Sequence, residues 1–127
     1  MPKLYKTCLL VDDNYIDNFV TRSILETGNF AEQVIVMQSP EEALGMLRSG
    51  GVKPDVIFLD IRMPVMSGFE FLDEYAGIDI ENKDSIKIYM LSSSLDPADY
   101  RKSSGNRFIT QFVNKPISHK TLEEIRK

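Results

Sequence analysis

Three short apolar runs constrain the fold of this chain more than any other feature. They are Leu9–Val11, Val56–Leu59 and Met90–Leu91, and each lies within a segment rich in β-branched and aliphatic side chains. Successive side chains of a strand point to opposite faces of a sheet, so a strand that is apolar at every position must be covered on both faces. The three runs therefore predict a sheet with helices packed on each side.

Two further segments of the same composition complete the set of predicted strands. The strands are predicted at Lys6–Val11, Gln33–Met37, Asp55–Leu59, Ile86–Leu91 and Phe108–Val113. Segments with helical spacing follow each of them, and these connections are too long for hairpins. The alternation predicts an α/β fold with a doubly wound, five-stranded parallel sheet.

The predicted helices carry their own boundary signals. The first spans about Tyr15 to Thr27, and one of its faces is lined by Ile16, Phe19, Val20, Ile24 and Leu25. The second begins after Ser39, a capping residue, with Pro40 at the first helical position. The others follow Ser67, Asp96-Pro97 and Ser118. The residues expected to be buried in the later helices are Ala43, Leu44, Leu47, Phe71, Leu72, Tyr75, Leu122 and Ile125.

Composition sets the broad class of protein. The 127 residues predict a single domain, residues 1–127, because domains cluster near about 100–150 residues. No apolar run approaches the roughly 18 residues that a membrane span requires. The apolar run near the N-terminus is short and interrupted by acids, which argues against a signal peptide and predicts a cytoplasmic protein. The net charge of −4 argues against direct nucleic-acid binding.

Polar side chains stand where the predicted strands end. Asp12 and Asp13 follow the first strand, and Asp60 follows the third. Ser92 follows the fourth strand and Lys115 the fifth. The carboxyl ends of parallel strands share one edge of the sheet, which is where ligands of such sheets bind. We therefore expect these side chains to converge, although they are far apart in the sequence.

This combination of side chains predicts a particular chemistry. Carboxylates that lie close together repel one another unless a cation compensates them. Oxygen ligands without histidine or cysteine favour a hard ion such as Mg²⁺, which also binds phosphate oxygens. With a hydroxyl and an ammonium nearby, such an ion forms a cradle for a phosphoryl group. Asp60, the single acid at the end of the central strand, is the predicted nucleophile.

At these positions the chain resembles the receiver domains of two-component response regulators, especially the stand-alone, chemotaxis-type regulators. The resemblance covers essentially the whole chain, and its motifs occur in the family's order and spacing: LLVDDN, VIFLDIRMPVMSGFEFL, YMLSSS and FVNKPI. It implies a (βα)5 flavodoxin-like receiver fold. It also implies phosphorylation of Asp60 by a histidine kinase or phosphotransfer protein, and Mg²⁺ held by Asp13, Asp60 and the backbone carbonyl of Arg62.

The resemblance assigns further roles. It implies that Asp12 acts through a metal-bound water, that Ser92 bonds a phosphoryl oxygen and that Lys115 pairs with the phosphate. It also implies a switch in which Ser92 moves toward the phosphoryl group and Phe112 turns inward. Many family members carry tyrosine at the Phe112 position, so phenylalanine keeps the packing but lacks the hydroxyl hydrogen bond. A cis bond before Pro116 is implied as well.

The leading hypothesis is a switch that is operated by phosphorylation and whose output is protein binding. Its only expected chemistry is its own phosphorylation and dephosphorylation, so we do not expect an enzyme. Because no DNA-binding module follows Lys127, the predicted output face comprises the fourth helix, the fifth strand and the fifth helix. A monomer or a phosphorylation-dependent dimer is expected. Exchanging Arg62 or Ser94 is predicted to change the lifetime of the phosphorylated state more than the fold.

Several alternatives remain open. The haloacid-dehalogenase class also phosphorylates an aspartate after a buried strand, but it needs a second acid two residues later, where Arg62 stands. A receiver-like module could bind partners without phosphate. The chain could also be a receiver fragment of a larger DNA-binding regulator or hybrid histidine kinase, because the last predicted helix is short. Singly, the site residues have ordinary roles, such as a helix cap for Asp12-Asp13 or a solvated charge for Lys115.

Overall fold

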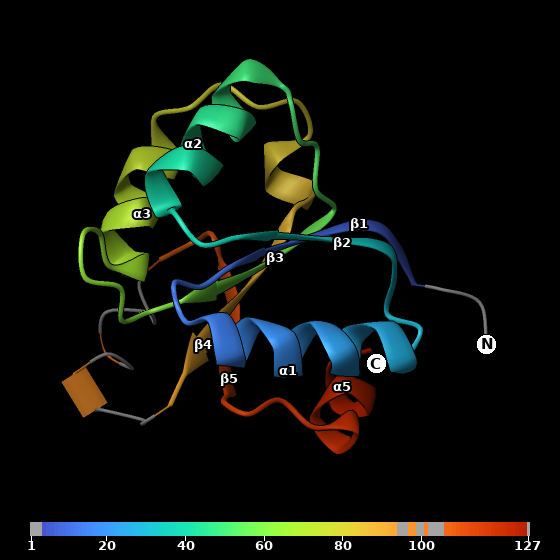
Figure 1. Cartoon of the computed structure of the whole chain (residues 1–127). Helices are drawn as coiled ribbons and strands as arrows, with labels where there is room; N and C mark the ends of the chain where they lie inside the picture. The colour runs from blue at the N-terminus through green and yellow to red at the C-terminus, as the bar shows by residue number, and fades with distance from the viewer. Residues whose placement is uncertain (1–3, 94–96, 99–100, 102–105, 127) are drawn as a thin grey trace.

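The computed structural model describes residues 4–93, 97–98, 101 and 106–126 (Figure 1). Their strands form one parallel sheet in the order β2-β1-β3-β4-β5. The strand bounds are Tyr5–Val11 for β1, Ala31–Met37 for β2, Val56–Asp60 for β3, Lys87–Ser92 for β4 and Ile109–Asn114 for β5. Each agrees with its predicted bound to within two residues, and the doubly wound, flavodoxin-like fold is confirmed.

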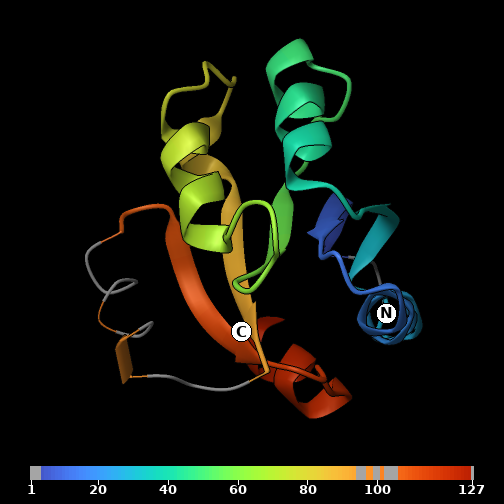
Figure 2. The same cartoon turned by 60° about the vertical axis from the view of Figure 1, so that its left-hand side comes forward.

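Helices cover both faces of the sheet. Their bounds are Tyr15–Thr27 for α1, Pro40–Ser49 for α2, Gly68–Ala76 for α3 and His119–Arg126 for α5, with a 3₁₀ turn, η1, at Lys83–Ser85. In Figure 2, α2 and α3 stand on one side of the sheet, and α1 and α5 stand on the other. The helix predicted after Asp96-Pro97 lies largely outside the described residues. Within the described ranges, no helix has the length and apolar character needed to cross a membrane.

The sheet separates two hydrophobic cores. The core on the side of α2 and α3 includes Leu9, Val11, Leu44, Ile57, Leu59, Phe71 and Met90. The core on the side of α1 and α5 includes Cys8, Leu10, Leu25, Val56, Phe58 and Leu122. Alternate residues of β1 and β3 thus enter opposite cores, as the uninterrupted apolar runs predict. Each large apolar side chain that is buried in this way contributes about 1.5–3 kcal/mol relative to exposure.

The caps and the buried faces of α2, α3 and α5 match the sequence signals. Ser39 Oγ accepts from the backbone N–H of Glu42 at 3.1 Å, which caps α2. Gly50 ends this helix with a φ of +79°, in the left-handed region that glycine adopts most readily. The residues predicted to be buried in these helices are all buried, namely Ala43, Leu44, Leu47, Phe71, Leu72, Tyr75, Leu122 and Ile125.

The apolar face predicted for α1 contacts the core only near the C-terminal end of the helix, through Ile24 and Leu25. The prediction is wrong for Ile16, Phe19 and Val20, which are exposed. Of the predicted residues only Leu25 is fully buried, and the inward side of the helix is completed by Asn18 and Thr21. Asn18 Nδ2 donates to the backbone carbonyl of Asp12 at 2.7 Å, which favours a rotation of the helix that turns this polar strip inward. Large apolar side chains are left in solvent. We call them the α1 patch: Tyr15, Ile16, Phe19 and Val20, which are 74%, 67%, 72% and 37% exposed.

Candidate functional site

Three carboxylates meet at the carboxyl edge of the sheet. Asp12 follows the last residue of β1, and Asp60 is the last residue of the neighbouring strand β3. One carboxylate oxygen from each of Asp12, Asp13 and Asp60 lies within 4.8 Å of the others. Asp12 is 0% and Asp60 4% exposed, whereas Asp13 is exposed. The parallel register brings together carboxylates that the sequence places in separate motifs.

The amino group of Lys115 lies beside the buried pair of carboxylates. Its Nζ is 3.0 Å from Asp12 Oδ2 and 3.2 Å from Asp60 Oδ1. The backbone of Lys115 is tied to β4, because its N–H donates to the carbonyl of Ser92 at 2.8 Å. Ser92 itself is 2% exposed at the end of β4. The Lys115–Pro116 bond is cis, as the resemblance implies.

The surroundings of Asp60 disfavour the ionised form of its carboxyl group. Burial and the negative charge of Asp12 raise the pKa of Asp60, while the charge and hydrogen bond of Lys115 lower it, and the result is a pKa of about 6. Burial alone would lower the pKa of Lys115, but hydrogen bonds to Asp17 and Asp12 and the surrounding negative charge raise it above its ordinary value. Lys115 is therefore a fixed positive charge beside the carboxylates of Asp12, Asp17 and Asp60.

Asp17 also belongs to the site, although it was not among the site residues predicted from the sequence. Asp17 Oδ2 lies 2.8 Å from Lys115 Nζ, the shortest of the three carboxylate contacts that the structure gives to this ammonium. A signal was available in the sequence, because Asp17 falls in the first turn of the predicted helix. Side chains there tilt back toward the helix N-terminus, and the N-terminus of α1 directly follows Asp12 and Asp13.

The loop after Asp60 is held close to the acid by a glycine. A Cβ on Gly68 would lie 2.6 Å from the backbone oxygen of Asp60, so no larger residue fits without a shift of the backbone. The N–H of Gly68 donates to the carbonyl of Ile61 at 2.8 Å, which closes the turn before α3. Ser67 and Glu70 then form a complete capping box. The structure thus explains the glycine and the capping serine of the VMSGFE segment.

The remaining predicted residues lie around this core of the site. Arg62 is exposed in the loop after β3, two residues beyond Asp60. Phe112 is half-buried in β5 and packs against the core on the side of α2 and α3. Ser94 lies outside the described residues. The structure therefore places Arg62 and Phe112 in positions compatible with their predicted roles, which stay predictions.

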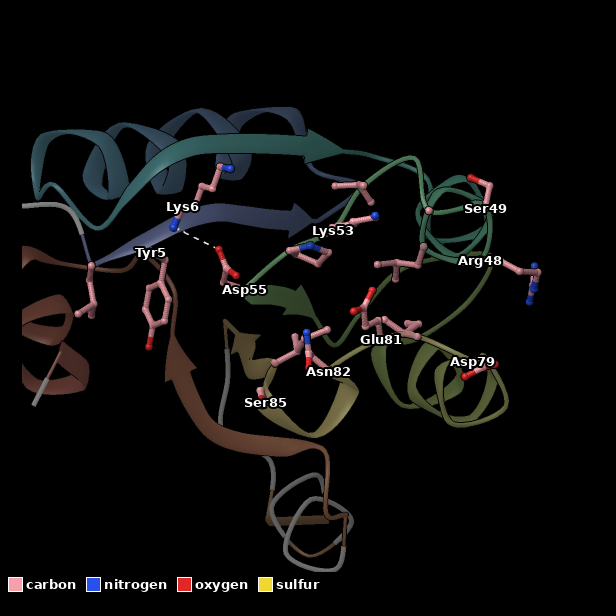
Figure 3. A pocket seen from close by; sticks show the side chains of 17 residues that line it. Tyr5, Lys6, Arg48, Ser49, Lys53, Asp55, Asp79, Glu81, Asn82 and Ser85 are labelled. Atoms are coloured by element: carbon pink, nitrogen blue, oxygen red, sulfur yellow. Dashed lines mark hydrogen bonds between the residues drawn. The ribbon is translucent and has the colours of Figure 1, made fainter.

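A pocket of about 670 Å³ opens at the amino ends of the strands, opposite the carboxylate cluster (Figure 3). It is lined by the beginning of β1 and by the segments before β3 and β4. Asp55 points into this region and its Oδ2 accepts from the backbone N–H groups of Lys6 and Thr7 at 3.2 and 3.0 Å. This pocket lies at the amino ends of the strands, so it shares no residue with the carboxylate cluster.

The donor set of the cluster fits a hard cation. Asp12, Asp13 and Asp60 offer only carboxylate oxygens, which Mg²⁺ and Ca²⁺ prefer over nitrogen or sulfur. Burial and the charge of Asp12 raise the pKa of Asp60 in spite of Lys115, so a further positive charge beside Asp60 would favour its ionised form. A divalent cation bound among these oxygens would supply that charge. The arrangement can therefore hold a metal ion and, beside it, an anionic group that contacts Lys115.

Comparison with known proteins identifies the class to which this fold and site belong. Residues 8–127 match the family described as the response regulator receiver domain. The chain belongs to this family, and it is the receiver domain of a two-component response regulator. Receiver domains are signalling modules that interact with histidine kinases and downstream effectors.

The similarity extends to individual relatives. The chain is 30% identical over 118 residues to the two-component response regulator ORR41 of Oryza sativa subsp. japonica, covering 90% of this chain and 86% of that protein. The crystal structure of a two-component response regulator from Cytophaga hutchinsonii superposes with a TM-score of 0.85 at 30% identity, covering 97% of this chain and 94% of the other.

Other relatives are much longer than this chain. A protein-glutamate methylesterase/protein-glutamine glutaminase of Trichodesmium erythraeum is 30% identical over 132 residues, which are 100% of this chain but 35% of that protein. The chain also matches two uncharacterised response regulatory proteins of Staphylococcus epidermidis, and it spans only 30% of the length of each. Receiver domains thus occur both nearly alone and as parts of larger proteins.

Proposed function

We propose that this chain is a switch that is operated by phosphorylation of Asp60. The observation that carries the proposal is the position of this carboxylate. It is buried at the end of β3, within reach of the oxygens of Asp12 and Asp13, and 3.2 Å from the ammonium of Lys115. Burial and the charge of Asp12 raise the pKa of this carboxyl group, so the ionised acid is unfavourable at this position, as is common for groups at functional sites.

The phosphoryl donor in this proposal is a phosphohistidine on a histidine kinase or phosphotransfer protein. A carboxylate oxygen of Asp60 attacks the phosphorus atom, the P–N bond breaks, and the imidazole keeps the electron pair of that bond. The product is an acyl phosphate on Asp60, and attack by water later restores the carboxylate and releases inorganic phosphate. Since the chain is itself the substrate, these steps do not make it an enzyme with turnover.

The other site residues support the same reaction. Mg²⁺, held by Asp13, Asp60 and the backbone carbonyl of Arg62, would neutralise charge on the phosphoryl oxygens. Asp12, fixed by Asn14 and Lys115, would contact the ion through a water. Lys115 already lies beside Asp60 and would pair with the phosphate. The donor chemistry of the carboxylate cluster supports this assignment.

The α1 patch supports a protein as the phosphoryl donor. Tyr15 and Ile16 begin the helix that directly follows Asp12 and Asp13, so they border the site. A protein that brings a phosphohistidine to Asp60 must cover this region, and exposed apolar side chains beside the acceptor offer it an apolar contact. We therefore propose that the donor protein docks on the α1 patch.

The proposed result of phosphorylation is the one expected from the sequence, namely the binding of a downstream protein. Phosphorylation would draw Ser92 toward the phosphoryl group and turn Phe112 inward, changing the face of helix four, β5 and α5 that binds a downstream protein. Residues 1–127 would form a single receiver domain that is monomeric or dimerises on phosphorylation. We also propose a cytoplasmic location and no direct contact with nucleic acid, in keeping with the net charge of −4.

Incubation with acetyl phosphate and Mg²⁺, followed by intact-mass measurement, tests this function. The wild type should gain one phosphoryl group, and chelation of Mg²⁺ should prevent the gain. Asp60→Asn should gain none, whereas Asp73→Asn, which removes an exposed acid of α3, should behave as the wild type. A wild type that gains no phosphate, or an Asp60→Asn variant that gains as much at the same site, would overturn the proposal.

A further inference from the structure

Asp17 makes a contact that its position in the helix does not require. It occupies the third position of α1, where an acidic side chain commonly turns back to the N-cap backbone to complete a capping box. Its backbone N–H does donate to the N-cap side chain, Asn14 Oδ1, at 3.0 Å. The N–H of Asn14, however, donates to Asp12 Oδ1 at 2.9 Å. The Asp17 carboxylate reaches Lys115 instead.

Helix α3 gives the comparison within the same molecule. Its third residue, Glu70, accepts from the backbone N–H of the N-cap Ser67 at 2.9 Å, and Ser67 Oγ accepts from Glu70 in return. The two helices thus use the acid at the same position differently. In α3 the acid stabilises the end of the helix, whereas in α1 the acid contacts the ammonium group of Lys115. The contact between Asp17 and Lys115 therefore calls for an explanation beyond helix capping.

Asp17 is also the carboxylate around Lys115 that can release it most easily. A lysine ammonium has three donor hydrogens, and three carboxylates surround this one, those of Asp12, Asp17 and Asp60. Asp12 and Asp60 belong to the cluster that can hold a metal ion, and Asp17 does not. Asp17 is 38% exposed, whereas Asp12 and Asp60 are almost fully buried. Water can replace Lys115 at Asp17 but not at the buried pair.

We propose that Asp17 is a positioning residue that competes with the phosphoryl group for Lys115 and thereby weakens the phosphorylated state. The inference rests on the proposed function of Asp60. A phosphoryl group on Asp60 needs a donor hydrogen of Lys115, and the contact with Asp17 is the one that can be given up without disturbing the cation site. The charge of Asp17 also repels the added phosphoryl charge, so competition and repulsion act in the same direction.

Binding of beryllium trifluoride, a stable mimic of a phosphoryl group on a carboxylate, tests this role directly. The affinity is measured by titration calorimetry and fluorine NMR at a Mg²⁺ concentration that saturates each variant. Asp17→Asn removes the charge and keeps the side-chain shape, and Asp17→Ser is a second charge-free variant. Asp17→Glu keeps the charge. Glu26→Gln is the matched control, because it removes one acid from the far end of α1, where Glu26 pairs with Arg22 on the surface at 3.5 Å.

Both charge-free variants should bind beryllium trifluoride about 3- to 10-fold more tightly than the wild type, as expected for the loss of a partly exposed ion pair. Asp17→Glu and Glu26→Gln should stay within about 2-fold of the wild type. Unfolding temperatures separate this role from a structural one. If the role of Asp17 were only structural, the charge-free variants would be less stable than the wild type and would not bind the mimic more tightly. Equal or weaker binding by the charge-free variants overturns the inference. A wild type that does not bind the mimic overturns the proposed function as well.

Discussion

Replacing Asp60 by its amide is expected to stabilise the folded chain when no divalent cation is present. Asp60 is 4% exposed, and burial together with the charge of Asp12 raises its pKa from 3.8 to about 6, even though Lys115 lowers it. At about 1.4 kcal/mol for each pKa unit, ionising this group in the folded state costs up to about 3 kcal/mol. For a chain of this length, that free energy corresponds to a rise in the unfolding temperature of up to about 10 °C.

The effect of the Asp60→Asn substitution should depend on pH in a defined direction. The folded pKa lies above the unfolded one, so the stability contributed by protonated Asp60 is full below about pH 4 and is lost as the pH rises through about 6. The variant should therefore match the wild type near pH 4. It should show about half of its advantage at pH 5 and the full advantage above about pH 7.

Urea and thermal unfolding in the presence of a chelator, at pH 5 and pH 8, measure this difference. Asp73→Asn serves as the control for removal of an exposed acid. Saturating Mg²⁺ should stabilise the wild type and shrink its difference from Asp60→Asn, because a ligand that binds only the folded state adds to its stability. An Asp60→Asn variant that is no more stable than the wild type at pH 8 would refute the reasoning, as would an advantage that is equal at both pH values.

Four further substitutions test separate parts of the chain. Ile16→Glu in the α1 patch should leave the rate of phosphorylation by acetyl phosphate unchanged. It should slow transfer from a phosphorylated donor protein by about 10-fold or more. Equal slowing with both donors would contradict the proposed docking of the donor protein on this patch. Arg62→Ala and Ser94→Ala should alter the rate of dephosphorylation more than the unfolding temperature, and unchanged rates in both would refute this. Lys83→Met should lower the free energy of unfolding by about 1–3 kcal/mol, measured in urea. Lys83 Nζ donates to the carbonyls of Ala76 and Ile78 and lies 5.1 and 5.2 Å from the ring centroids of Tyr75 and Phe108; an unchanged stability would show that these contacts contribute nothing.

The strands could be predicted from the sequence because their signal is local. Continuous apolar runs such as Val56–Leu59 have one favourable environment, the interior of a sheet covered on both faces. The parallel connection then brings strand ends to a common edge, so the meeting of Asp12 and Asp60 with Lys115 followed from topology. Gly50 and Ser39 likewise marked helix ends through backbone conformation and capping, which depend on neighbouring residues only.

The orientation of α1 could not be predicted in this way. Apolar spacing gives the face of a helix that prefers burial, but it does not include the polar contacts that compete with it. Asn18 turns inward to donate to the carbonyl of Asp12, and Phe19, the next residue, is therefore 72% exposed. A helix that must reach a binding partner can keep apolar residues in solvent, and periodicity alone does not distinguish this case from core packing.

Asp17 was missed for a related reason. In the sequence it is one more acid in the first turn of a helix, where acids are common because they interact favourably with the helix dipole. Its contact with Lys115 joins residues from opposite ends of the chain and depends on the rotation of α1 about its axis. The place of Asp17 in the first helical turn indicates that it lies near the site, but only the structure shows its contact with Lys115.

The identity of the phosphorylated residue is the central claim, and reductive trapping tests it most directly. Borohydride reduces an acyl phosphate to an alcohol, so a phosphorylated aspartate becomes homoserine and can be located by tandem mass spectrometry. After treatment with acetyl phosphate and Mg²⁺, homoserine should appear at position 60 and at neither Asp12 nor Asp13. Homoserine at another aspartate, or at none while the intact protein has gained phosphate, would contradict the assignment of Asp60 as the phosphoryl acceptor.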